Sequence, residues 1–214
     1  ETPKPMVPVG GRPIIEILLG RFQKAGVTKA HLAVNHLAEQ IETHLGNGAK
    51  MGLEIVYSRE AEPLSTVGPI KLIKDLPDNF IVANGDVLTD LNVKTLFDYH
   101  IEQEAELTVA TCHREDRIDY GVLETSESNR VTGFTEKPSY SFRVSMGVYV
   151  FSKSILGMVP EGKPFGFDEL VVAMLQQKGR LISYPFTGYW RDIGRPEDYE
   201  QVQEDVEEIK GLVE

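Results

Sequence analysis

Residues 80–86 read FIVANGD, a short apolar run that passes directly into a polar turn. The apolar part predicts a buried strand over residues 80–83. Gly85 allows a tight turn, and Asp86 then places a carboxylate just past the strand end. In open α/β sheets, ligands bind beyond the carboxyl ends of the strands. This stretch therefore predicts both a buried sheet and a ligand-binding edge, although an Asp that only forms the turn is the plain alternative.

The segments on both sides of this strand alternate between predicted strands and helices. In the first half we expect helices at 14–25, 36–45, 69–76 and 92–104, and strands at 30–35, 53–57 and 107–112. In the second half we expect strands at 121–125, 130–136, 146–151 and 181–185, and helices at 168–177 and 196–212. This alternation predicts an α/β fold with a mostly parallel sheet that is covered on both faces. Because no linker composition interrupts the chain, we expect one continuous domain.

Composition excludes several classes of function. The chain has 214 residues and a formal net charge of -11, without a run of basic residues, so we expect no nucleic-acid partner. No apolar stretch approaches the roughly 20 residues that a membrane span needs, so we expect no membrane association. Cys112 is the single cysteine, which excludes an intrachain disulfide framework. With no visible signal peptide, a reducing, cytoplasmic setting is the expectation.

A second acidic residue stands in a turn-like context. Asp192 lies in residues 190–196, WRDIGRP, where an aromatic residue, an acid and a glycine precede a helix that starts at Pro196. Taken alone, Asp192 could be a simple turn residue. If it meets Asp86 in space, two carboxylates together with phosphate oxygens and water suit octahedral Mg²⁺.

Three charged side chains are further candidates. Glu136 and Lys137 form an acid–base pair at a predicted strand end, directly before Pro138. Such a pair is often only an exposed surface pair, which contributes little. In the functional interpretation, Glu136 accepts hydrogen bonds from sugar hydroxyls and Lys137 binds a phosphate. Lys4, between two prolines, is an isolated cation on a restrained backbone.

Six stretches, in order, resemble the sugar-phosphate nucleotidyltransferases. This group includes mannose-1-phosphate guanylyltransferases and glucose-1-phosphate thymidylyl- and uridylyltransferases. The stretches are residues 3–13 (PKPMVPVGGRP), 84–86 (NGD), 120–122 (YGV), 136–138 (EKP), 146–149 (MGVY) and 190–196 (WRDIGRP). The resemblance implies a Rossmann-like three-layer α/β/α fold with a mostly parallel mixed central sheet. It also implies that residues 1–214 form a single nucleotidyltransferase catalytic domain.

The resemblance assigns roles to individual residues. Asp86 and Asp192 would ligate the Mg²⁺ cofactor, and Lys4, Asp86, Lys137 and Asp192 would form the catalytic set. The nucleotide site would be built from Lys4, Leu64, Ser65, Thr66, Gly68, Asn84 and Gly85. The sugar-phosphate site would be built from Gly121, Glu136, Lys137, Ser145 and Gly147.

The chain departs from the family pattern at three places. The family's Gly-rich phosphate loop should lie before Thr2, so we expect the first strand and this loop to be missing and the domain to be N-terminally incomplete. Ser65 stands where the family usually has Gly, near the base. Ser145 stands where many members have Asn, near the sugar.

The implied reaction joins an NTP and a sugar 1-phosphate to give an NDP-sugar and pyrophosphate. GTP with mannose 1-phosphate or a related sugar is the preferred pair, and dTTP or UTP with glucose 1-phosphate is the alternative. Such an enzyme would serve nucleotide-sugar and polysaccharide biosynthesis, and a homo-oligomer is left open. The competing interpretations are a metal-dependent glycosyltransferase, which usually shows Asp-x-Asp, and a non-catalytic NDP-sugar-binding regulatory protein.

Overall fold

The computed structural model describes residues 2–35, 37–60 and 62–213. The α-helices are α1 (Ile14–Lys24), α2 (Ala38–Leu45), α3 (Val93–Glu102), α4 (Phe167–Gln176), α5 (Pro196–Asp205) and α6 (Lys210–Val213). Short 3₁₀ helices are η1 (Lys4–Met6), η2 (Ala49–Met51), η3 (Gly68–Leu72) and η4 (Lys153–Met158). The strands are β1 (Pro8–Val9), β2 (Arg12–Pro13), β3 (Lys29–Val34), β4 (Glu54–Arg59), β5 (Asn79–Ala83), β6 (Val87–Thr89), β7 (Leu107–Arg117), β8 (Gly121–Thr125), β9 (Val131–Glu136), β10 (Ser139–Ser152), β11 (Leu181–Pro185) and β12 (Trp190–Asp192).

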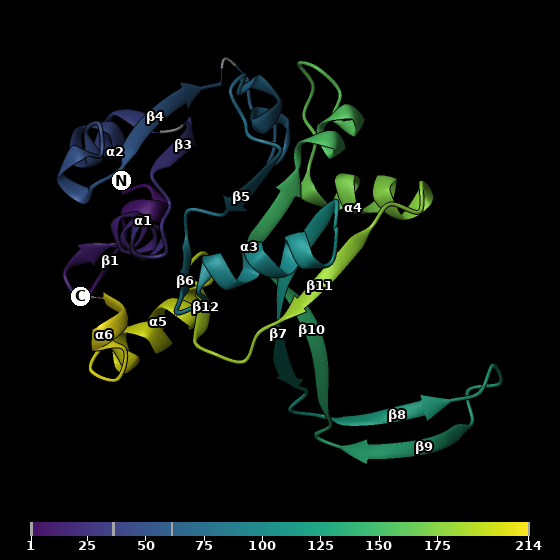
Figure 1. Ribbon diagram of the computed structural model, residues 1–214. Coiled ribbons are helices and arrows are strands. Elements are labelled where there is room, and N and C mark those ends of the chain that lie inside the picture. The colour runs from purple at the N-terminus through teal and green to yellow at the C-terminus, as the bar shows by residue number, and fades with distance from the viewer. Residues whose placement is uncertain (1, 36, 61, 214) are drawn as a thin grey trace.

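The central sheet has four strands in the order β11-β7-β10-β5 (Figure 1). β11 runs parallel to β7, whereas β10 is antiparallel to both of its neighbours, so β5, β7 and β11 share one direction. A second pair, β3 and β4, is parallel and forms its own two-stranded ladder. The predicted α/β class with a mixed sheet is confirmed. The expectation that a first strand is missing stays a prediction.

Apolar side chains pack on both faces of the four-stranded sheet. On one face, Leu18 and Phe22 of α1 and Leu96 of α3 meet Val148 and Val150 of β10. On the other face, α4 packs through Leu170 and Met174 against β5, β7 and β10. Strand residues alternate sides with a period of two, so adjacent residues of β10 enter different cores. The result is the expected three-layer arrangement.

Local sequence explains where several helices begin and how they face the core. The predicted apolar stripe of α1 is buried, from Ile14 to Phe22. Asn92 caps α3, because its Oδ1 accepts hydrogen bonds from the backbone N–H groups of Lys94 (2.9 Å) and Thr95 (3.4 Å). The strand predicted at 181–185 has the bounds of β11. The positions of these elements therefore follow from the local sequence.

Other predicted elements differ from the structure. The helix expected at 196–212 is wrong as one helix, because α5 ends at Asp205 and α6 starts at Lys210. The break lets Ile209, Leu212 and Val213 pack against the core around Ile14. The helix expected at 69–76 is the short 3₁₀ helix η3. The start of the predicted helix at 36–45 includes residue 36, which lies outside the described residues.

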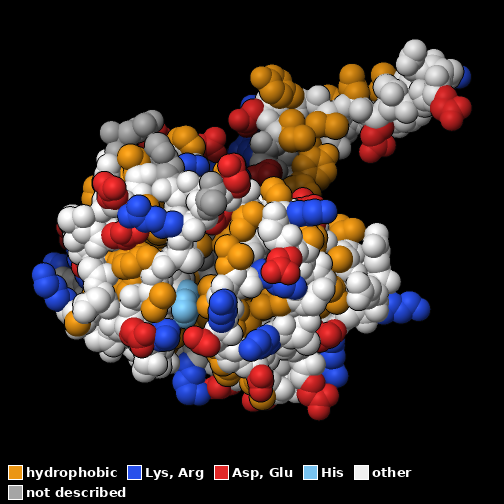
Figure 2. Space-filling model, turned by 90° about the horizontal axis from the view of Figure 1, so that it is seen from above, with side chains coloured by type: hydrophobic (Ala, Val, Ile, Leu, Met, Phe, Trp, Pro, Cys, Tyr) orange, Lys and Arg blue, Asp and Glu red, His pale blue; other side chains and the backbone are white. Residues whose placement is uncertain are grey.

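β8 and β9 form an antiparallel hairpin, called the arm below, that projects away from the body (Figure 1). Its large apolar residues are exposed: Leu123 is 57% accessible, and Val131 and Phe134 are both 61% accessible. Figure 2 shows the arm standing clear of the body with hydrophobic side chains on its surface.

None of the helices that the structure describes has the length and the apolar composition of a membrane span.

Candidate functional site

Asp86 and Asp192 are brought together by a short antiparallel ladder. β6 starts directly after Asp86 and pairs with β12, so that Asp192 lies opposite Val87. The Ile193 N–H donates to the Asp86 carbonyl oxygen at 3.0 Å. Because Asp86 also follows the carboxyl end of β5, the pair lies at the sheet edge that the sequence predicted.

Gly194 leaves the space in which the two carboxylates meet. A Cβ placed on Gly194 would lie 3.1 Å from Asp86 Oδ2, 3.0 Å from Asp192 Oδ1 and 3.7 Å from Lys4 Nζ. The Gly194 N–H donates to Asp192 Oδ1 at 3.0 Å, which orients this carboxylate. Three of the four predicted catalytic side chains therefore converge on one point.

The electrostatics of Asp86 fit a cation site. Burial raises the pKa of the Asp86 carboxyl, and the nearby charge of Asp192 raises it further, while a backbone hydrogen bond and the charge of Lys4 partly oppose both effects. Two carboxylates that destabilise each other's charge are stabilised by a divalent cation between them. Within the described chain, no group of three or more His, Cys, Asp or Glu side chains forms a metal cluster. Mg²⁺ often uses one or two carboxylates and takes its other oxygens from substrate and water, so this donor set fits Mg²⁺.

The N-terminal segment lies against the turn that carries Asp86. Lys4 starts the 3₁₀ helix η1, whose proline at the second position restrains the backbone. A Cβ on Gly85 would lie 3.3 Å from Pro5 Cγ, so Pro5 packs directly on that turn. This contact places Lys4 beside the two carboxylates.

Asn84 meets a bulge in β10 that holds two predicted sugar-site residues. The β10–β7 register shifts between Ser145 and Tyr149. Within this bulge, Gly147 has a φ of 73°, which favours glycine. The Asn84 N–H donates to the Gly147 carbonyl at 2.8 Å, and the Gly147 N–H donates to Ser145 Oγ at 3.3 Å. A residue predicted for the nucleotide site, Asn84, is therefore hydrogen-bonded to a residue predicted for the sugar site, Gly147.

Residues 64–68 form a loop that packs against the start of α4. The backbone N–H groups of Val67 and Gly68 both donate to the Phe165 carbonyl, at 3.0 and 3.1 Å. Thr66 Oγ1 accepts from the Phe167 N–H at 3.0 Å. Ser65 has a φ of 65°, a conformation that costs a residue with a side chain more than it costs glycine. The serine that replaces the family's usual glycine at position 65 therefore adopts a backbone conformation that is less favourable for it than for glycine.

The remaining predicted sugar-site residues lie at the base of the arm. Gly121 pairs with Glu136 across the β8–β9 ladder. A Cβ on Gly121 would lie 3.1 Å from Glu136 Oε2, and the Lys137 N–H donates to the Tyr120 carbonyl at 3.3 Å. In the described part of the chain, no hydrogen bond or ion pair joins Glu136 or Lys137 to the Asp86–Asp192 cluster. Their roles stay predictions.

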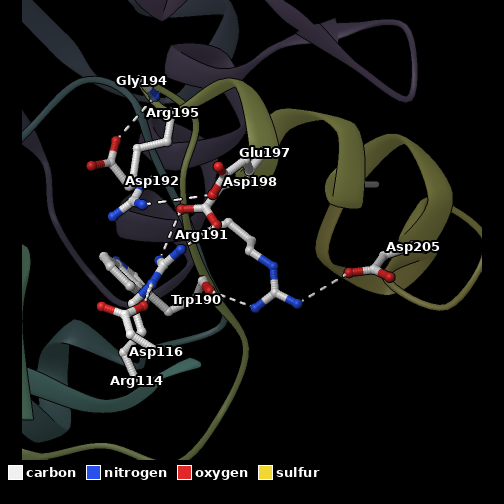
Figure 3. Close-up of polar contacts among 10 residues, drawn as sticks. All are labelled: Arg114, Asp116, Trp190, Arg191, Asp192, Gly194, Arg195, Glu197, Asp198 and Asp205. Carbon is white, nitrogen blue, oxygen red and sulfur yellow. Dashed lines mark hydrogen bonds and ion pairs between the residues drawn. The ribbon is translucent and has the colours of Figure 1, made fainter. Parts of the chain in front are cut away.

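Three features of this region were not predicted from the sequence. Gly194 has no side chain, which leaves open the space beside the Asp86 and Asp192 carboxylates. Trp190 Nε1 donates to the Met146 carbonyl at 2.8 Å and so ties β12 to the β10 bulge. Arg114 and Asp198 form an ion pair, which Figure 3 draws together with Asp192 and Gly194. None of these contacts has a signal in local sequence, because each joins distant segments.

The fold and the site together define an α/β protein with two carboxylates and a lysine beyond the end of a sheet strand, and comparison with known proteins gives its family. The sequence matches the nucleotidyl transferase family over residues 1–209, so the chain belongs to that family.

Among curated relatives, the chain is 35% identical to the mannose-1-phosphate guanylyltransferase catalytic subunit beta of Drosophila melanogaster, over 92% of this chain and 55% of that protein. It is 32% identical to the mannose-1-phosphate guanylyltransferase of Mycobacterium tuberculosis, over 99% of this chain and 60% of that protein. The chain therefore spans well under two thirds of the length of these relatives.

Solved structures agree with the fold. HddC from Yersinia pseudotuberculosis superposes with a TM-score of 0.73 at 27% identity, covering 95% of this chain and 89% of that one. A putative glucose-1-phosphate thymidylyltransferase from Bacillus anthracis gives a TM-score of 0.75 at 19% identity, covering 96% and 87%, and supports the fold alone.

Proposed function

We propose that the protein transfers a nucleotidyl group from an NTP to a sugar 1-phosphate, giving an NDP-sugar and pyrophosphate. The observation that carries this proposal is the convergence of Asp86, Asp192 and Lys4 around Gly194, beyond the carboxyl end of β5. Two carboxylates and a cation at such an edge suit the binding of a metal and a polyphosphate. The reaction would belong to nucleotide-sugar biosynthesis, and we propose that it takes place in the cytoplasm.

GTP and mannose 1-phosphate are the proposed substrates. Support comes from relatives at 32–35% identity that are named mannose-1-phosphate guanylyltransferases. Another structure of HddC, 26% identical with a TM-score of 0.74, is described as a complex with GMP-PN. Both findings concern other proteins, and they favour guanine over thymine or uracil for this chain.

The proposed chemistry needs no general base. The second pKa of a phosphate monoester lies near ~6, so the attacking sugar-phosphate oxygen is already ionised at neutral pH. The remaining task is to offset repulsion between anions and to align the reacting groups. Asp86 and Asp192 would hold Mg²⁺, which supplies positive charge to the phosphate oxygens. Lys4 adds a fixed positive charge beside the same point.

The other residues would bind and orient the substrates. Asn84, Gly85 and the loop of Leu64, Ser65, Thr66 and Gly68 are proposed to contact the nucleotide. Ser145 and Gly147 of the β10 bulge and Gly121, Glu136 and Lys137 at the arm base are proposed to contact the sugar phosphate. Since Asn84 is hydrogen-bonded to Gly147, the two substrates would lie side by side.

The test measures pyrophosphate release and NDP-sugar formation from GTP, mannose 1-phosphate and Mg²⁺. We expect Asp86→Asn to reduce turnover at least 100-fold, because it removes one of two charged metal ligands. Asp98→Asn is the matched control, since Asp98 is exposed on α3 and forms an ion pair with Lys94 at the surface. Near-wild-type turnover in Asp86→Asn would overturn the proposal.

A panel of nucleotides separates the alternatives. Comparing GTP, dTTP and UTP, each with mannose and glucose 1-phosphates, ranks the substrate pairs by kcat/KM. We expect GTP with mannose 1-phosphate to rank first. Binding of an NDP-sugar without turnover of any pair would instead support a regulatory sugar-nucleotide-binding protein.

A further inference from the structure

Arg114 and Asp198 form a partly buried ion pair with two parallel hydrogen bonds. Arg114 Nη1 donates to Asp198 Oδ2 at 3.1 Å, and Nη2 donates to Oδ1 at 3.0 Å. The two side chains are 23% and 9% exposed. Asp116 adds only a longer contact of 4.0 Å to Arg114 Nε. A two-bond arginine–carboxylate pair fixes the relative orientation of its two elements, which a point charge does not do.

The pair joins two elements that both lead to predicted site residues. Arg114 lies on β7 opposite Phe142 of β10, shortly before the chain enters the arm. Asp198 lies in the first turn of α5, where a negative charge is favoured by the helix dipole. The pair therefore connects the root of the arm to the beginning of α5.

The start of α5 is directly continuous with the Asp192 loop, defined as residues 192–195. At its first end this loop is held by the β12–β6 ladder and by the Ile193 N–H, which donates to the Asp86 carbonyl. At its second end the Arg195 N–H donates to the Asp192 carbonyl at 3.1 Å, and the Arg195 carbonyl accepts from Tyr199 of α5 at 3.0 Å. The first turn of α5 is thus linked to the backbone of Asp192 through Arg195.

The other contacts of α5 act elsewhere along the helix. Val202 is buried in the core around Ile14 and Leu88. Tyr199 and Gln203 reach the Pro8 carbonyl at 3.5 and 3.3 Å. At the last residue of α5, Asp205 Oδ2 accepts from Tyr189 Oη at 3.1 Å and from Arg191 Nη2 at 3.5 Å. These single bonds and the non-directional apolar packing fix the start of the helix less tightly than the two-bond ion pair does. Asp198 is the charged member of the buried face of α5.

We propose that Arg114 and Asp198 are positioning residues, which hold the Asp192 loop against Asp86 and keep the arm root in register with it. This inference rests on the proposed function, because the geometry that the pair sets is that of the proposed metal site. Neither residue touches the reacting atoms. Their effect is expected on the placement of Asp192, and through it on metal affinity and kcat.

The first measurement is amide hydrogen exchange of the 214-residue chain without metal or substrate. We expect Arg114→Met to increase exchange at the Ile193 N–H, which marks closure of the loop on Asp86. The control is Arg180→Met, since Arg180 forms an exposed single-bond pair with Glu104 near the other end of β7. Exchange at Ile193 should be unchanged in that control.

The second measurement is Mn²⁺ binding followed by electron paramagnetic resonance. We expect Arg114→Met to weaken Mn²⁺ binding about tenfold, in the range seen when residues that orient metal ligands are removed. Arg114→Lys keeps the charge but loses the two-bond geometry, so its affinity should fall between those of the wild type and Arg114→Met. In turnover, kcat should fall with little change in the KM for nucleotide.

The outcomes separate the two proposals. Unchanged Ile193 exchange in a folded Arg114→Met variant overturns the positioning role, and Arg114→Lys decides the question if Arg114→Met does not fold. Equal Mn²⁺ affinity in the wild type and both Arg114 variants also overturns it. Absence of turnover in the wild type would count against the proposed function, while the exchange measurement would still decide whether the pair holds the loop.

Discussion

At the residue scale, the charged carboxylate of Asp86 lowers the stability of the folded protein. Its carboxylate is partly buried and faces Asp192, and both effects raise its pKa above the ordinary value, with only partial relief from Lys4. An acid with a raised pKa in the folded state stabilises the fold while it is protonated. That stabilisation is lost as the pH rises through the raised pKa.

Asp86→Asn should therefore stabilise the metal-free protein at pH 7. We expect the unfolding midpoint to rise by roughly 2–4 °C, which corresponds to about 1 kcal/mol for a chain of this size. The gain should shrink as the pH falls through the raised pKa toward the ordinary carboxyl pKa, because the wild-type carboxyl then becomes protonated in the folded protein. Thermal melts with a chelator at pH 7 and pH 4 measure this, with Asp98→Asn as control. A lower midpoint for Asp86→Asn at pH 7 would contradict it.

Gly194 is important because it lacks a side chain, which leaves room beside the Asp86 and Asp192 carboxylates. A Cβ there would lie 3.0 Å from Asp192 Oδ1 and 3.1 Å from Asp86 Oδ2, so it would enter the space beside both carboxylates. We expect Gly194→Ala to lower kcat at least tenfold with little change in thermal stability, because small misplacements of reacting groups are costly. Gly157→Ala is the control, since nothing lies within 4 Å of a Cβ at Gly157. Equal activity of the two variants would show that the space beside Gly194 is not used.

At the element scale, Glu16 ties α1 to α2. Its carboxylate contacts Arg12 at 2.9 Å and His44 Nε2 at 2.8 Å. Burial raises the pKa of Glu16, but hydrogen bonds with His44 and Arg12 outweigh this, and the net shift is downward. An acid with a lowered pKa contributes stability above its ordinary pKa, and this is lost as the pH falls through the lowered value.

Glu16→Gln should lower the free energy of unfolding by about 1 kcal/mol at pH 7. The difference from wild type should be smaller at pH 3, since the stabilisation is lost progressively as the pH falls from the ordinary carboxyl pKa through the lowered one. Urea unfolding at the two pH values measures the effect. Glu54→Gln, which breaks the exposed pair with Lys29, should change stability by less than about 0.5 kcal/mol. A loss that does not depend on pH would argue against the ionic contribution.

Elements with long apolar periodicity were predicted well from sequence, and elements without it were not. The buried stripe of α1 and the bounds of β11 followed from local pattern. The three-residue strands β6 and β12 were not predicted, because so short a run carries no periodic signal. These two strands nevertheless bring Asp86 and Asp192 together. The sequence therefore left open whether Asp86 and Asp192 meet, and the pairing of β6 with β12 brings them together.

At the scale of the whole molecule, the arm is separate from the body. Leu123 and Phe134 are cross-strand partners on one face of the arm, and both are exposed. Exposed apolar side chains gain little from folding, since little of their surface leaves water. The arm should therefore tolerate polar substitutions that the core would not.

Replacing both residues, as Leu123→Ser with Phe134→Ser, should change the free energy of unfolding by less than about 1 kcal/mol. Phe151→Ala in β10, where the side chain is fully buried, should cost roughly 3–5 kcal/mol. Denaturant unfolding of both variants at several protein concentrations makes the comparison. A large loss in the double variant would show that the arm is covered in solution.

The amino-acid sequence alone was sufficient for the α/β class and for the strand that ends at Ala83, three residues before Asp86, and it predicted the residue types of a metal and phosphate site. Each of these depends on neighbouring residues, whose periodicity and turn chemistry act locally. Only the tertiary structure decided that Asp192 lies beside Asp86 and that Arg114 meets Asp198, 84 residues further along the chain. Such contacts depend on pairing between distant strands and helices, and no local pattern encodes which distant partner a short strand or a single charge will meet.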